Sequence, residues 1–172
     1  MTSSMGISAA IALILAMGTA QAQPASGHDD MGMTHHDDRP AGKSGYAPGL
    51  GEIMALQQMR HSKLWFAGRA GNWKLADYEF DELKEGFDDA KTYSPTHGDV
   101  PVAQMIGSIM PQPLAALEGA IKARDAAKFT AAFDGLTAAC NTCHQGADHG
   151  FIVIRRPTTL PYTNQDFAPA RP

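Results

Sequence analysis

The chain has only two cysteines, both inside one short motif, and this scarcity excludes a small fold held together by several disulfides. It also lacks any run of lysine and arginine, since 14 basic residues stand against 18 acidic ones for a formal net charge of −4. A nucleic-acid binder needs a basic face to neutralise phosphates, so that class is excluded. Aromatic residues make up only 8%, but 172 residues with 44% hydrophobic content are ordinary for one globular domain.

Residues 1–22 are typical of an export signal. An apolar stretch over residues 7–18 precedes a small-residue cleavage site, Ala20-Gln21-Ala22. The stretch is shorter than the roughly 20 residues that span a bilayer. We therefore expect a soluble protein exported to the periplasm and cut after Ala22. Because residues 1–4 contain no lysine or arginine, an uncleaved anchor that associates loosely with the membrane is the alternative.

Residues 23–49 form a lead in which glycines and prolines interrupt any periodicity, so we expect it to be flexible. Within it, the segment from His28 to Asp38 gathers imidazoles, thioethers and carboxylates. Such a tract can hold a divalent or cuprous ion loosely. The alternative, which we favour, is a solvated acidic linker, because nothing in the spacing fixes a coordination geometry.

Residues 50–146 follow a helical period throughout, with apolar positions recurring every three or four residues. We expect four helices, joined by short connections near residues 70 and 125 and by one longer link. Asn72 and Asp125 are candidate N-caps. The predicted fold is all-α: an antiparallel up-down four-helix bundle that buries the apolar stripes.

Two prolines interrupt the third helical segment. Pro111 and Pro113 each remove a backbone hydrogen bond and clash with the preceding turn, so we expect a kink or a break there. After the last helix, residues 147–172 are rich in proline and are expected to form an extended tail on the surface.

The motif that carries chemistry is Cys140-Asn141-Thr142-Cys143-His144. Two cysteines three residues apart on a helix project from the same side, so both sulfurs can bond to the two vinyl groups of one haem. The adjacent histidine then lies where an imidazole nitrogen can bind the iron. This spacing is the attachment signal for c-type haem, and it predicts one covalent haem c.

Three other interpretations of the motif have less support in the sequence. A thioredoxin-like pair expects a strand that leads into the helix, and no strand is predicted before residue 140. A disulfide between residues three apart closes a very small loop and stabilises little. A zinc site needs two more ligands, and His149 supplies only one candidate.

The stretch that leads into the motif, AIKARDAAKFTAAF over residues 120–133, resembles the last helix of the cytochrome c prime family, the class II c-type cytochromes. The resemblance covers about residues 114–144 and is only architectural over 50–110. It implies a haem fixed to the fourth helix, with Cys140 and Cys143 as thioether sites and His144 as proximal ligand. Family members often form dimers, so the resemblance is also compatible with a homodimer. The chain departs from the family in the long tail that follows the motif.

Met54 and His61 are the candidates for the second axial ligand of the iron. They share a helix face, but their depths differ if the first and last helices run antiparallel. At about 1.5 Å per residue, Met54 lies roughly 4 Å from the level of His144, whereas His61 lies roughly 15 Å from it. Met54 is therefore the predicted ligand, with His61 as the alternative. A core methionine and a buried, hydrogen-bonded imidazole are the competing interpretations.

Two neighbouring features complete the expected site. Arg60 is a candidate to contact a haem propionate, with solvent exposure as the alternative. His149 follows His144 too closely in sequence to reach the opposite face of the haem.

These features favour an electron carrier that serves redox partner proteins and is not itself an enzyme. A His/Met-ligated iron shuttles single electrons without bond chemistry. The family resemblance supports an alternative, a five-coordinate haem protein that binds nitric oxide or carbon monoxide. A peroxidase is the third possibility, and it would need His61 as an acid–base residue beside an open iron.

Overall fold

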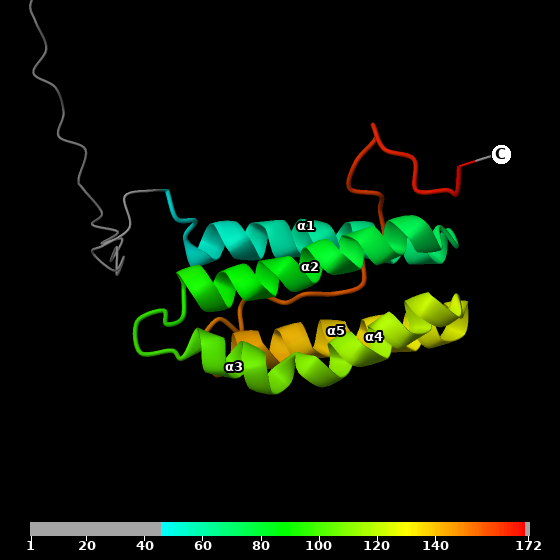
Figure 1. Cartoon of the computed structure of the whole chain (residues 1–172). Coiled ribbons are helices and arrows are strands. Elements are labelled where there is room, and N and C mark those ends of the chain that lie inside the picture. The colour runs from blue at the N-terminus through cyan, green and yellow to red at the C-terminus, as the bar shows by residue number, and fades with distance from the viewer. Residues whose placement is uncertain (1–45, 171–172) are drawn as a thin grey trace, which may run out of the picture. The chain divides into compact units, whose positions relative to one another are not determined.

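The structure is a computed structural model that describes residues 46–170. The expected export signal over 1–22 lies outside the described residues, as does the lead over 23–49 except for its last four residues. The described part contains five helices and no strand, as the all-α prediction requires (Figure 1). The helices are α1 (Leu50–Arg69), α2 (Trp73–Tyr93), α3 (Val102–Ile109), α4 (Pro111–Ala123) and α5 (Ala126–Gly146).

The two N-caps predicted from the sequence are confirmed. Asn72 Oδ1 accepts a hydrogen bond of 3.2 Å from the Leu75 amide at the start of α2. Asp125 Oδ1 accepts bonds of 3.0 Å from the amides of Ala127 and Lys128 at the start of α5. These bonds hold the pKa of Asp125 below its usual range, and the bond from the Lys128 amide lowers this pKa most. Both caps satisfy amides that have no partner inside their helix.

The predicted break at the prolines is also confirmed. Helix α3 ends at Ile109, and α4 begins at Pro111 after the single residue Met110. Proline is tolerated at the first position of a helix, where its missing N–H group would have had no partner. The chain therefore starts a new helix at Pro111 instead of kinking an old one.

Helices α1 and α2 pack side by side, as do α4 and α5, and α1 also contacts α5 (Figure 1). At one end of the α1–α5 contact, aromatic rings fill the core: the Trp65 ring lies 4.9 Å from that of Phe133, and the Trp73 ring 5.9 Å from that of Phe129. Gly68 is required here, because a Cβ atom would lie 2.1 Å from Phe129 Cζ. The helices thus approach closely at this end.

The segment after α5 forms no helix or strand over residues 147–170, and it runs back along the helices toward their opposite end (Figure 1). Most of its residues are exposed, but it also contacts the helices. Phe167 is buried and packs against Phe66 with ring centroids 5.9 Å apart. Asn72 Nδ2 donates to the Ala168 carbonyl at 3.1 Å. The tail is therefore part of the packed structure.

Within residues 46–170, no helix combines the length and the apolar character needed to cross a membrane.

Candidate functional site

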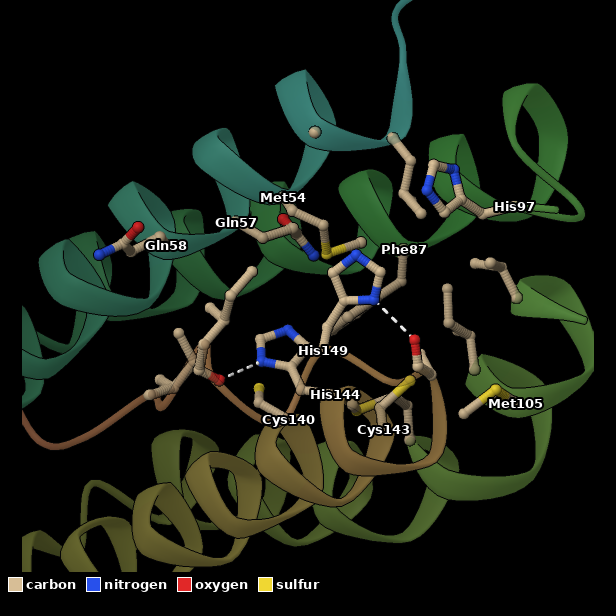
Figure 2. Close-up of a pocket in the computed structure, with 18 of the residues that line it drawn as sticks. Met54, Gln57, Gln58, Phe87, His97, Met105, Cys140, Cys143, His144 and His149 are labelled. Carbon is tan, nitrogen blue, oxygen red and sulfur yellow. Dashed lines mark hydrogen bonds between the residues drawn. The ribbon is translucent and has the colours of Figure 1, made fainter. Parts of the chain in front are cut away.

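A cavity of about 440 Å³ lies at the end of the helices where α5 finishes (Figure 2). This volume falls within the range of roughly 300–1,000 Å³ that is typical of ligand and cofactor sites. Its walls come from α1, α2, α3, α5 and the start of the tail. Most of the lining side chains are apolar, among them Leu50, Met54, Leu83, Phe87, Val100, Val102, Met105, Ile106, Met110, Ile152 and Ile154. The polar groups are few, and most are imidazoles.

Both cysteines line this cavity from α5, partly buried and with free thiols. Burial raises the pKa of Cys140 to about 12, and it also raises the pKa of Cys143. The pair lies in the last two turns of α5, where the helix dipole also disfavours a thiolate. A thioredoxin-like pair needs the opposite, a thiol with a lowered pKa. The site therefore argues against redox chemistry by the thiols themselves.

The His144 imidazole lines the same cavity and is held by the tail. Its Nδ1 atom lies 2.8 Å from the carbonyl oxygen of Ile152 (Figure 2). A carbonyl oxygen can only accept, so Nδ1 carries the proton and Nε2 keeps its lone pair. This is the arrangement that prepares a histidine to bind a metal through Nε2.

A second imidazole, that of His149, also lies in the cavity. Figure 2 shows its ring between Met54 and Cys143. Its Nδ1 donates to the Ala147 carbonyl at 2.6 Å, and its ring centroid lies 5.8 Å from that of His97. Neither His149 nor His97 was predicted to line this cavity. The helix stop after Gly146 was the available signal, since a turn there can bring the next residues back over the site.

The backbone explains why His149 returns to the cavity. Asp148 has a φ of 57°, in the left-handed region, and this reverses the chain just after α5. The His149 amide then donates to the His144 carbonyl at 2.8 Å. The two side chains are thus neighbours on one rim of the cavity.

Met54 and His61 both line the cavity from α1, but they differ in burial and in hydrogen bonding. Met54 is partly buried, and its side chain points into the cavity from α1, across from α5 (Figure 2). His61 is only 4% exposed, with its ring 4.3 Å from that of Phe133. Burial lowers the pKa of His61 to about 4, so the ring is neutral at pH 7.

One nitrogen of His61 is already engaged. His61 Nε2 lies 2.9 Å from Thr137 Oγ1, and the Thr137 hydroxyl itself donates to the Phe133 carbonyl at 2.9 Å. With the hydroxyl proton used in this way, Thr137 accepts the bond from His61 Nε2–H. The His61 ring is thus fixed to α5 through one of its two nitrogens, whereas the Met54 side chain points into the cavity (Figure 2).

Arg60 is not among the residues that line the cavity. Its guanidinium donates to Glu82 Oε2 at 3.1 Å and to Gln57 Oε1 at 3.4 Å, which links α1 to α2. Arg60 is thus paired with α2 outside the lining of the cavity, and its contact with a haem propionate stays a prediction. Arg156, in the tail, pairs with Asp134 of α5 and lies 4.6 Å from the centre of the Trp65 ring.

In the described part of the chain, no three His, Cys, Asp or Glu side chains are grouped so that they could hold a metal ion.

Comparison of the chain with protein families, with curated proteins and with solved structures gave no match.

Proposed function

We propose that this protein is an exported, periplasmic c-type cytochrome that carries one covalent haem and transfers single electrons. The observation that carries the proposal is that Cys140, Cys143 and His144 all line one largely apolar cavity. In this proposal α3 and α4 together form the third arm of an antiparallel up-down four-helix bundle. The contacts of α1 with α2 and of α4 with α5 support that description.

The residues around the cavity fit a haem. Cys140 and Cys143 would hold it through thioether bonds, because their sulfurs lie on the same side of α5. His144 would bind the iron through Nε2, the nitrogen that its bond to Ile152 leaves free. When bound, the haem iron supplies a centre that takes up and releases one electron.

The second axial position is proposed for Met54. The thioether of Met54 is a soft ligand on the wall across from α5, and a His/Met pair raises the reduction potential of haem iron. The apolar side chains of α2 and α3 that line the cavity would surround a bound haem with a medium that disfavours water. The proposed partners are redox proteins that exchange electrons with this site.

Two alternatives are less well supported. A haem protein that binds nitric oxide or carbon monoxide at five-coordinate iron needs a cavity wall opposite His144 that carries no protein ligand. Met54 lies on this wall. A peroxidase requires a side chain that takes up a proton beside the iron, whereas the His61 ring is held by Thr137 and burial lowers its pKa to about 4.

The pyridine haemochrome spectrum of the denatured full-length protein, expressed in a host with haem-ligation machinery, tests the proposal. We expect one haem per chain, with the absorption of a haem bonded through two thioethers. Extraction with acid acetone should remove none of it. The Cys140→Ala, Cys143→Ala double variant should lose all covalent haem. A colourless wild-type protein, or haem that acid acetone extracts, would contradict the proposal.

A further inference from the structure

Asn141 is the first residue between the two cysteines, and its side chain makes two hydrogen bonds to a single residue of the tail. Asn141 Nδ2 donates to the Ile154 carbonyl at 2.8 Å, and the Ile154 amide donates to Asn141 Oδ1 at 2.7 Å. The amide side chain thus satisfies both backbone polar groups of Ile154, as a neighbouring strand would. Because residues 147–170 contain no helix or strand, this pairing is a specific anchor for the tail.

The anchored segment contains the carbonyl that orients His144. Ile152 lies two residues before Ile154, and its carbonyl accepts the 2.8 Å bond from His144 Nδ1. The Ile152 amide in turn donates to the His149 carbonyl at 2.8 Å. Asn141 and His144 are three residues apart on α5, about one turn, so the same helix carries the anchor and the oriented imidazole. Before Ile152 the His149 amide donates to the His144 carbonyl of α5 at 2.8 Å, and after it Ile154 bonds to Asn141, so the loop is tied to the helix on both sides of Ile152.

We propose that Asn141 is a positioning residue for His144. By holding Ile154, it fixes the Ile152 carbonyl at the place where it accepts from His144 Nδ1, which sets the tautomer and direction of the imidazole. The inference rests on the proposed function, because the bond at Nδ1 makes Nε2 a stronger donor to a metal. A stronger donor favours ferric over ferrous iron and lowers the reduction potential.

Thr142 provides a matched control within the same motif. It also lies between Cys140 and Cys143, but its hydroxyl donates to the Ala138 carbonyl of its own helix at 3.0 Å. Thr142→Ala therefore alters the motif without removing a bond to the tail.

The first experiment measures the midpoint potential of the haem-loaded full-length protein by spectroelectrochemistry. Asn141→Ala removes both bonds, and Asn141→Leu removes them while keeping the side-chain volume, should the smaller residue impair folding. We expect each to favour ferrous iron by about tenfold, an upward shift of ~59 mV for a one-electron couple, whereas Thr142→Ala stays at the wild-type value. Asn141 variants that match Thr142→Ala would overturn the proposal.

The second experiment does not depend on haem. In the unloaded full-length protein, amide hydrogen exchange at Ile154 and the ¹⁵N shifts of His144 report the anchor and the tautomer directly. We expect the Asn141 variants to speed exchange at Ile154 at least tenfold and to lose the preference for the proton on Nδ1. Faster exchange with an unchanged tautomer would overturn the positioning role.

The two failures are distinguishable. Wild-type protein without haem refutes the proposed function, and the measurements on the unloaded chain still decide whether Asn141 orients His144. Wild-type protein with haem, but with an unchanged tautomer in the Asn141 variants, refutes the inference alone.

Discussion

The two ends of the α1–α5 pair are built in opposite ways. At one end Gly68 lets the Phe129 ring press against the α1 backbone, and Phe129 and Phe133 are fully buried. At the other end a cavity of about 440 Å³ lies between Met54 on α1 and His144 on α5. The same two helices are thus in tight contact at the aromatic end and held apart at the cavity end.

The difference separates stability from chemistry. A filled aromatic core contributes dispersion and burial energy, whereas a cavity forgoes those contacts along its walls. The groups with reactive atoms, Cys140, Cys143, His144 and His149, all line the cavity end. Substitutions at the aromatic end should therefore change the free energy of unfolding most, and substitutions at the cavity end should change the site with less effect on stability.

The largest expected effect on stability is that of Phe129→Ala. Removing a fully buried phenyl ring should lower the free energy of unfolding by about 3–5 kcal/mol, because the surrounding helices cannot collapse fully into the space. Urea denaturation followed by circular dichroism measures this loss. Leu160→Ala, at an exposed leucine of the tail, is the control and should change it by less than about 0.5 kcal/mol. Equal losses in the two variants would refute the role of the buried Phe129 ring in stability.

His61 lies between the two ends and should make stability depend on pH. Its pKa is about 4 in the folded protein and 6.5 when unperturbed, so the unfolded chain takes up the proton first as the pH falls. The free energy of unfolding should therefore keep its highest value above pH 6.5. It should decrease by about 3 kcal/mol as the pH falls from 6.5 to 4. Urea midpoints across this range measure the decrease. His61→Gln, which can still donate to Thr137, should flatten the curve; an unchanged slope would contradict this assignment.

Met54→Ala should have a small effect on stability and a large effect on the site. Its side chain is partly buried and faces the cavity, so its truncation should lower the free energy of unfolding by only about 1 kcal/mol. If the proposed haem is bound, the same change should lower its midpoint potential and abolish the near-infrared band that a sulfur–iron bond produces. Leu56→Ala, an exposed position on the same helix, should leave the spectrum unchanged. A high-spin spectrum in the wild type would favour the gas-binding alternative instead.

The smallest effect is expected for Arg156→Ala. This half-exposed side chain joins the tail to Asp134 and lies over the Trp65 ring. Exposed ion pairs and cation–π contacts are screened by water, so the loss should stay below about 1 kcal/mol. Thermal unfolding measures it, and a larger loss would mean that the tail closes the aromatic end more tightly than its exposure indicates.

Much of the helical framework could be predicted because its causes are local. The caps at Asn72 and Asp125 act on amides within three residues, and the break at Pro111 follows from the covalent structure of proline. The start of α1 at Leu50 and the end of α5 at Gly146 coincide with the limits of the helical period in the sequence.

The site was predictable only in part. The spacing of the motif indicates that Cys140, Cys143 and His144 share one side of a helix, and the structure brings them to one cavity. The bonds of Ile152 and Ile154 could not be predicted, because backbone groups in an irregular tail leave no periodic signal in the sequence. The same holds for Arg60, whose partner Glu82 depends on how α1 packs against α2.

The close approach of Gly68 to Phe129 has a mechanical consequence. From this contact at Gly68, α1 extends roughly 21 Å to Met54, at ~1.5 Å per residue. A tilt of α1 by about 3° around Gly68 would move Met54 by about 1 Å. Such a tilt would also stretch the bond between His61 and Thr137, which joins the same two helices between Gly68 and Met54, so this bond opposes a change in the width of the cavity.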